Sequence, residues 1–132
     1  MTIAVDTNIL IRAAARDDVQ QTRAAVDLLH NEESIVIPII ALCEFVWVMR
    51  QGFKKPATEV AQSIRSLVDS DNVVTDAQAV DAGLETLDKG GDFADGVIAY
   101  EGHWLGAEEL VSFDKQAVSL LRSRGRKARL LS

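Results

Sequence analysis

The chain begins with Thr2-Ile3-Ala4-Val5-Asp6-Thr7-Asn8-Ile9-Leu10, in which small and β-branched residues run directly into an acid, a hydroxyl and an amide. Such a run predicts a buried strand that ends in polar groups at the edge of a sheet. In an open parallel α/β sheet, ligands bind outside the carboxyl ends of the strands, so Asp6 is a candidate functional residue. The alternative interpretation is that Asp6 only caps the helix that follows.

Strands and helices are predicted to alternate along the rest of the chain. Short strands are expected over residues 34–38, 73–75, 110–114 and 128–131. Helices are expected over residues 9–15, 19–30, 39–51, 57–68, 76–87 and 115–122, with one more beginning at Asp92. This alternation predicts one domain spanning residues 1–132. Its class is α/β, with a small central parallel sheet of four to five strands between two layers of helices.

The composition excludes several classes of protein. A hydrophobic fraction of 48% and a charged fraction of 26% are typical of a soluble globular protein. No apolar run approaches the roughly 20 residues of a membrane span. Nor does the chain begin with the basic and apolar stretches of a secretory signal, so we expect a cytoplasmic protein.

The net charge of −6 is unevenly distributed. Residues 122–132 contain no acid and five cations, Arg122, Arg124, Arg126, Lys127 and Arg129. One interpretation of this basic tail is a solvated helix end, which the helix dipole favours; the other is a contact with phosphate groups. Similarly, His103 and Trp104 are interpreted as structural residues, with a contact to RNA as the alternative for His103.

Four more acids occupy positions that suggest chemistry. Asp114 follows a short strand, as Asp6 does, so the two are expected at one edge of the sheet. Asp92 and Asp95 begin a helix that can reach the same edge, and Glu44 lies within an apolar helix. The alternatives are capping for the aspartates and an exposed helix face for Glu44.

Carboxylates that gather without a nearby lysine or arginine repel one another unless a cation offsets their charge. A site built only from oxygen ligands favours Mg²⁺ or Mn²⁺ over Zn²⁺. Such an ion can activate water and stabilise charge when a phosphodiester is cleaved. The acids therefore predict a metal-dependent reaction at a phosphate group.

Four motifs, in this order, resemble those of PIN-domain ribonucleases, and most closely the short VapC-type toxins of type II toxin–antitoxin pairs. They are residues 5–10, the acid Glu44 within an apolar helix, Asp92-Phe93-Ala94-Asp95-Gly96-Val97-Ile98-Ala99 and Val111-Ser112-Phe113-Asp114. The resemblance implies a PIN-like three-layer α/β/α fold.

The resemblance also implies the roles of individual residues. It implies a catalytic tetrad of Asp6, Glu44, Asp95 and Asp114, in which Asp6, Asp95 and Asp114 hold the metal. Asp92 is an additional acid near that metal, and Thr7, Asn8 and Ser112 are supporting residues that orient carboxylates or water. Two positions depart from the family pattern. Gln116 stands where a further acid is common, and Gly96 stands where alanine is usual, which predicts a looser first helical turn.

The function implied by the resemblance is a metal-dependent endoribonuclease that cuts single-stranded or looped RNA, such as tRNA. Its cofactor would be Mg²⁺, with Mn²⁺ as a substitute. The resemblance further implies a homodimer and a small cognate antitoxin that blocks the site. We expect the antitoxin to contact residues 39–68. The alternative is a catalytically silent PIN-like module that binds RNA or protein. A phosphoacceptor receiver domain is disfavoured because Asp6 has no acidic neighbour and the last strand carries no suitable lysine.

Overall fold

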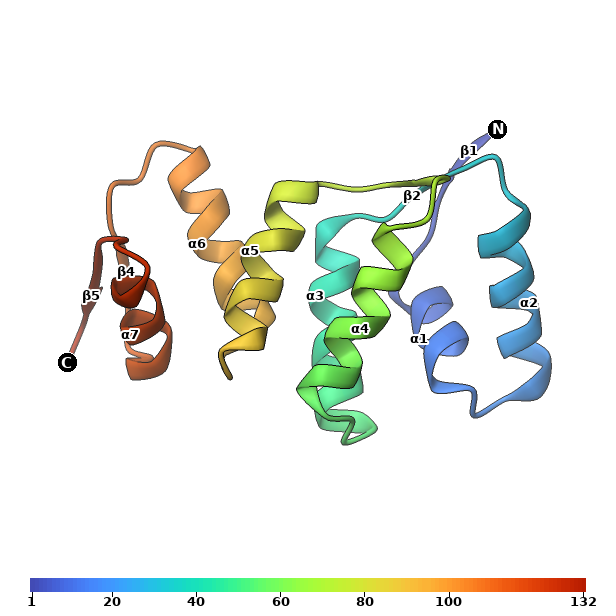
Figure 1. Cartoon of the computed structure of the whole chain (residues 1–132), viewed down its shortest axis with the longest axis horizontal. Helices are drawn as coiled ribbons and strands as arrows, with labels where there is room; N and C mark the ends of the chain where they lie inside the picture. The colour runs from blue at the N-terminus through green and yellow to red at the C-terminus, as the bar shows by residue number, and fades with distance from the viewer. The chain divides into compact units, whose positions relative to one another are not determined.

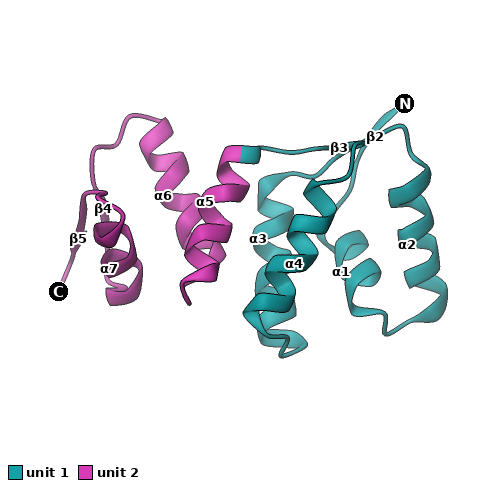
Figure 2. Cartoon of the chain, viewed as in Figure 1, with its two compact units in different colours: residues 1–77 teal, residues 78–132 magenta.

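The computed structural model describes all 132 residues and divides into two compact units, residues 1–77 and 78–132 (Figures 1 and 2). The first unit contains β1 (Thr2–Ala4), α1 (Thr7–Ala15), α2 (Val19–Asn31), β2 (Ser34–Val36), α3 (Ile39–Trp47), the π-helix η1 (Val48–Gly52), α4 (Ala57–Val68) and β3 (Val73–Val74). The second contains α5 (Ala77–Asp88), which begins at the boundary, α6 (Phe93–Trp104), β4 (Leu110–Ser112), α7 (Lys115–Ser123) and β5 (Ala128–Leu130).

The first unit is organised around a parallel sheet in the order β1-β2-β3. Ile35 of β2 lies opposite Ile3 on one side and Val73 on the other, and it is fully buried. Parallel neighbours require crossover connections, which here are helical. Because β1 and β2 run in the same direction, α1 and α3 both begin near the carboxyl edge of this sheet.

The second unit contains a smaller parallel sheet, the pair β4-β5, in which Leu110 lies opposite Ala128. Val118 and Leu121 of α7 are buried together with Ala128 and form the core of this part of the unit. The chain leaves β4 at Ser112 and begins α7 at Lys115, so Asp114 lies directly after the strand, as Asp6 does in the first unit.

The α/β class is confirmed, since parallel strands alternate with helices along the chain. The five strands form one sheet of three and one of two. The assignment of residues 1–132 to a single domain stays a prediction. No helix of the chain is both long and apolar enough to cross a membrane.

The predicted helix over residues 39–51 differs from the structure in two ways. The α-helix ends at Trp47 and continues as η1. The apolar pattern of this helix predicts that Ile40, Phe45, Val48 and Trp47 face the core. Phe45 is buried, but Ile40 and Trp47 are 67% and 65% exposed, so the prediction is wrong for these two residues. Nearly every residue of α3 is apolar, and a helix that is apolar all round does not indicate which side faces the core.

Candidate active site

Asp6 caps α1 and keeps carboxylate oxygen available for a ligand. The N–H of Ile9 donates to Asp6 Oδ1 at 3.3 Å, which is a typical N-cap geometry. The side chain is exposed and forms no ion pair. The capping interpretation of Asp6 is therefore correct, and it leaves the second oxygen without a protein partner.

Glu44 lies on the exposed side of α3 and is connected to the start of α1. The hydroxyl of Thr7 donates to Glu44 Oε1 at 3.1 Å. This contact places Glu44 beside the residue that follows Asp6, so the first unit contributes two carboxylates at one edge of its sheet. Asn8 was expected to support the acids, but its side chain contacts none of them through a hydrogen bond and instead lines a groove between α1 and α2.

The second unit contains the other three acids, Asp92, Asp95 and Asp114. Asp92 caps α6 by accepting from the N–H of Ala94 at 3.3 Å, and Asp95 lies in the first turn of that helix. Asp114 caps α7, where Oδ1 accepts from the N–H groups of Gln116 and Ala117 at 2.9 and 3.1 Å. The nearby carboxylates of Asp92 and Asp114 both act electrostatically on Asp95.

The pKa of Asp95 is raised by its surroundings. Partial burial raises the pKa of Asp95 above the ordinary aspartate value, and the negative charges of Asp92 and Asp114 raise it further. The ionised form of Asp95 is thus disfavoured in the absence of a cation. A positive ion near Asp95 would reduce that penalty.

None of the five carboxylates forms an ion pair, although the chain contains 14 lysine and arginine residues. Acids without cationic side chains nearby, one of them with a raised pKa, are suited to a hard divalent cation. Within either unit, no three His, Cys, Asp or Glu side chains lie close enough to hold a metal ion. Asp6 and Glu44 belong to the first unit, and Asp92, Asp95 and Asp114 belong to the second.

Ser112 and Gln116 hold Asp114 in place. Ser112 Oγ accepts from the backbone N–H of Asp114 at 2.9 Å, which supports the positioning role that was expected of it. The Gln116 amide donates to the carbonyl of Gly90 at 2.8 Å, which ties the start of α7 to the turn before α6. Gln116 therefore provides a hydrogen bond between two segments at a position where an acid could have been a metal ligand.

Gly96 does not loosen α6 as predicted. A Cβ atom built on Gly96 would lie 2.4 Å from the carbonyl oxygen of Ala82 and 2.6 Å from Thr86 Oγ1. Only glycine permits α6 to approach α5 this closely. Gly96, the residue after Asp95, is thus tightly packed. This contact could not be predicted from local sequence because it joins two helices.

Comparison with known proteins supports the interpretation of these residues. A family model described as the PIN domain matches residues 3–120, a range that contains Asp6, Glu44, Asp92, Asp95 and Asp114. No curated protein gives a significant match to the chain.

Proposed function

Because the chain belongs to the PIN domain family, whose members are generally metal-dependent nucleases, we propose that it is a Mg²⁺- or Mn²⁺-dependent endoribonuclease. Its substrate would be single-stranded or looped RNA, such as tRNA, and its products would carry a 5′-phosphate and a 3′-hydroxyl. The observation that carries this proposal is the set of five carboxylates that lack ion-pair partners, with Asp95 held at a raised pKa by Asp92 and Asp114.

In the proposed reaction, Asp6, Asp95 and Asp114 hold the divalent cation, and Asp92 adds negative charge beside them. When bound, this cation would polarise the phosphodiester and lower the pKa of the attacking water.

Glu44 would orient the water or accept its proton, with the water attacking in line with the leaving oxygen. The hydroxyl of Thr7 holds one oxygen of Glu44, so the other oxygen is left to face the water. Ser112 and the capping N–H groups hold Asp114 through its backbone and Oδ1, which leaves Oδ2 for the cation.

The first experiment is cleavage of a mixed pool of tRNA and structured RNA by the purified protein with Mn²⁺. We expect cutting that EDTA abolishes and that is absent in the Asp95→Asn variant, with folding of the variant checked by circular dichroism. A matched control is Asp27→Asn, which removes one exposed carboxylate from α2 and is expected to retain activity. Full activity of Asp95→Asn would refute the assignment.

We also propose that the protein is the toxin of a toxin–antitoxin pair, forms a homodimer and is inhibited by a small cognate antitoxin. Ile40 and Trp47 support a partner surface on α3, since they are seven residues apart on one helix face and both are exposed. Induced expression of the wild-type chain is expected to arrest the growth of a bacterial host, whereas Asp95→Asn is not. If the wild-type chain and Asp95→Asn both arrest growth, the toxicity does not arise from RNA cleavage.

A catalytically silent module remains the competing function, and Gln116 favours it because a family acid is missing there. The cleavage experiment separates the two. A folded protein that binds RNA, and that fails to cut any RNA in Mn²⁺ across the pool, would support the silent module.

A further inference from the structure

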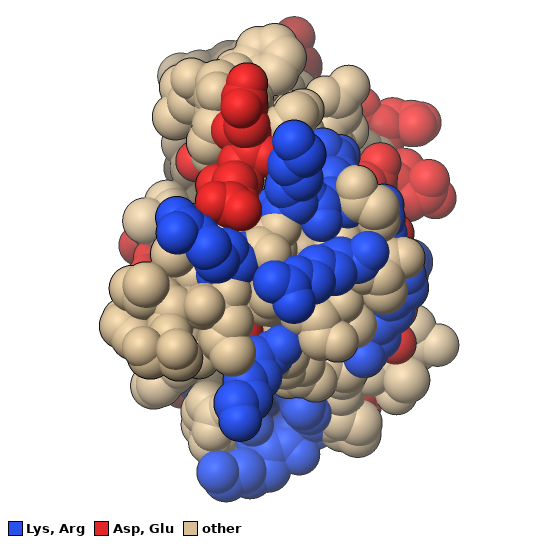
Figure 3. Space-filling model, turned by 90° about the vertical axis from the view of Figure 1, so that its left-hand side faces the viewer, with Lys and Arg blue, Asp and Glu red and all other residues tan.

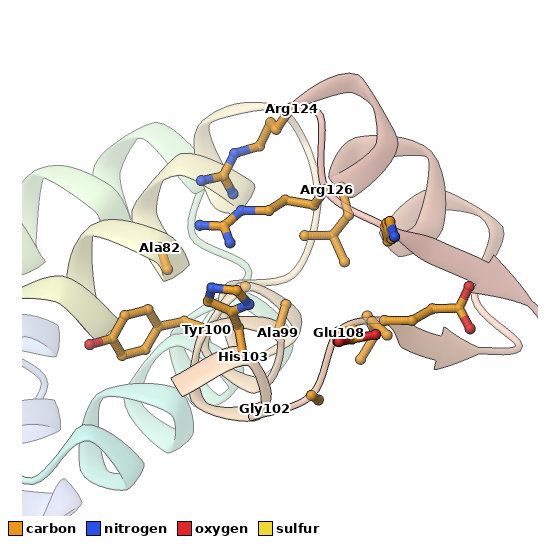
Figure 4. A pocket seen from close by; sticks show the side chains of 14 residues that line it. Ala82, Ala99, Tyr100, Gly102, His103, Glu108, Arg124 and Arg126 are labelled. Atoms are coloured by element: carbon orange, nitrogen blue, oxygen red, sulfur yellow. The ribbon is translucent and has the colours of Figure 1, made fainter. Parts of the chain in front are cut away.

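A second feature of the 78–132 unit lies away from its acids. A pocket of about 80 Å³ is formed by α6 from Gly96 to His103, by Ala82 of α5, by the end of α7 and by the chain segments that lead into β4 and β5 (Figure 4). A single water needs about 10–15 Å³ by this measure, so the pocket accommodates a larger group. Tyr100, His103, Arg124, Arg126 and Lys127 contribute polar and aromatic side chains to its lining.

His103 and the acids lie at opposite ends of α6, although Gly96, the residue after Asp95, also lines the pocket. Asp95 lies in the first turn of α6, whereas His103 lies in the last, about 12 Å further along the helix axis. Likewise, Asp114 follows the carboxyl end of β4, whereas Leu110 at the start of β4 lines the pocket. A ligand held by His103 and Lys127 therefore lies at the other end of α6 and β4 from Asp95 and Asp114.

Two of the cations at the pocket have no acidic partner. Arg124 is neutralised by Glu85, with Nη2 and Oε2 2.6 Å apart, and Arg129 outside the pocket is paired with Glu109 at 3.2 Å. Arg126 and Lys127 are exposed and form no ion pair or side-chain hydrogen bond. In a chain with a net charge of −6, unpaired cations at a pocket attract an anionic ligand.

Figure 3 shows lysine and arginine side chains gathered across the face of the molecule that carries the end of the chain. In Figure 4, the guanidinium groups of Arg124 and Arg126 point in the same direction above the imidazole of His103. The hydroxyl of Tyr100 donates to Gln78 at 2.8 Å, which orients its ring at the pocket. The arrangement combines positive charge with ring faces on which a base can stack.

We propose that this pocket binds a phosphate–ribose unit of the RNA, together with its base, at a distance from the cleaved bond. The choice of RNA rests on the proposed function. Glu108 and Glu109 also line the pocket and can accept hydrogen bonds, which the 2′-hydroxyl and amino groups of RNA can donate and the carboxylate side chains of an acidic peptide cannot. Arg124, Arg126 and Lys127 follow the residues that match the PIN domain model, so the family match does not cover these three cations.

The proposal is tested by binding in EDTA, where no metal-dependent cleavage occurs. The probe is a fluorescently labelled RNA hairpin with a single-stranded extension, and the readout is anisotropy at several salt concentrations. Arg126→Ala and Lys127→Ala are each expected to weaken binding and to lower the slope of log K against log salt by about 0.7, the value for one phosphate contact on a single strand. The control Arg23→Ala removes an exposed, unpaired cation from α2 and is expected to leave the slope unchanged.

A second pair of variants distinguishes binding of RNA in the pocket from general attraction of RNA to positive charge. His103→Ala is expected to weaken binding roughly five-fold or more through lost stacking, without changing the salt slope. His30→Ala, which removes the other exposed histidine, is expected to bind as the wild type does. Wild-type slopes in both Arg126→Ala and Lys127→Ala would overturn the proposal, as would equal losses in the pocket variants and their controls. If polyglutamate displaces the RNA and its binding depends on Arg126, the proposal that the ligand is RNA is refuted.

Failure of this proposal is distinguishable from failure of the proposed nuclease activity. Pocket-dependent RNA binding without any cleavage in Mn²⁺ would refute only the nuclease activity. If cleavage occurs, Arg126→Ala is expected to raise KM for a long RNA and to leave the cleavage of a short oligonucleotide unchanged. If the wild type and Arg126→Ala cleave the long RNA equally well, and likewise the short oligonucleotide, only the proposal that the pocket binds RNA is refuted.

Discussion

Replacing Gly96 by alanine tests whether the close approach of α6 to α5 positions Asp95. The new Cβ would lie 2.4 Å from the carbonyl oxygen of Ala82 and 3.0 Å from its carbonyl carbon. These are backbone atoms, which no side-chain rotation can move away. Restoring an ordinary contact therefore requires a relative shift of the two helices by about 1 Å.

The net effect on stability follows from two opposing contributions. Alanine is favoured over glycine within a helix by about 1 kcal/mol. Overpacking of a buried contact typically costs about 1–3 kcal/mol, and a backbone clash at this distance places the cost at the upper end. We expect Gly96→Ala to lower the free energy of unfolding by about 1–2 kcal/mol, which corresponds to a decrease in Tm of roughly 3–10 °C for a chain of this size.

The assay is thermal unfolding in EDTA, followed by circular dichroism, with Gly102→Ala as the control. Gly102 lies on the same helix, and a Cβ built there meets no atom within 4 Å. This control is expected to raise stability by about 0.5–1 kcal/mol through helix propensity alone. If Gly96→Ala proves as stable as Gly102→Ala, the close packing of α5 and α6 is refuted. Because Gly96 follows Asp95, a shift of 1 Å is also expected to lower cleavage by up to about 100-fold.

Three further predictions concern the acids. Since the pKa of Asp95 is raised, the folded state holds its proton more tightly than the unfolded state, and stability without metal is lost as pH rises through that pKa. The Tm of Asp95→Asn minus that of the wild type in EDTA is therefore expected to increase from acidic to neutral pH; a difference independent of pH would contradict this. Thr7→Val frees Glu44 and is expected to reduce kcat by about 10- to 100-fold with little change in KM, measured on a single RNA substrate. Gln116→Glu removes the hydrogen bond to Gly90 and adds negative charge, so we expect a lower Tm in EDTA and a larger rise in Tm on adding Mn²⁺ than in the wild type; equal Mn²⁺-induced rises would contradict the expected metal contact.

Local patterns predicted most of the secondary structure. Residues 57–68 form α4 with the predicted bounds, because Pro56 and the helical spacing of Val60 and Ile64 mark its start and its buried face. Capping was also predictable, since a short acid before an apolar helical run accepts hydrogen bonds from its own first turn. Asp6, Asp92 and Asp114 all do so.

The members of the candidate site stay a prediction, and only some of their contacts could be expected from the sequence. The clustering of Asp95 with Asp92 and Asp114 was expected and is observed within the second unit. The link from Thr7 to Glu44 was not expected, because these residues are far apart in sequence and their contact depends on how α1 packs against α3. The exposure of Ile40 and Trp47 was missed for a related reason: an apolar helix has no polar side to indicate its orientation.

The sequence determined the order of the elements, the caps and the residue types available for metal and phosphate chemistry, because these depend on neighbours within a few positions. Only the tertiary structure decided which charges remain unpaired. Glu85 neutralises Arg124 but leaves Arg126 without a partner, and no rule of spacing distinguishes these two residues of the same basic tail. Ion pairing depends on distances of a few ångströms between elements that are remote in the chain, and those distances are set by packing.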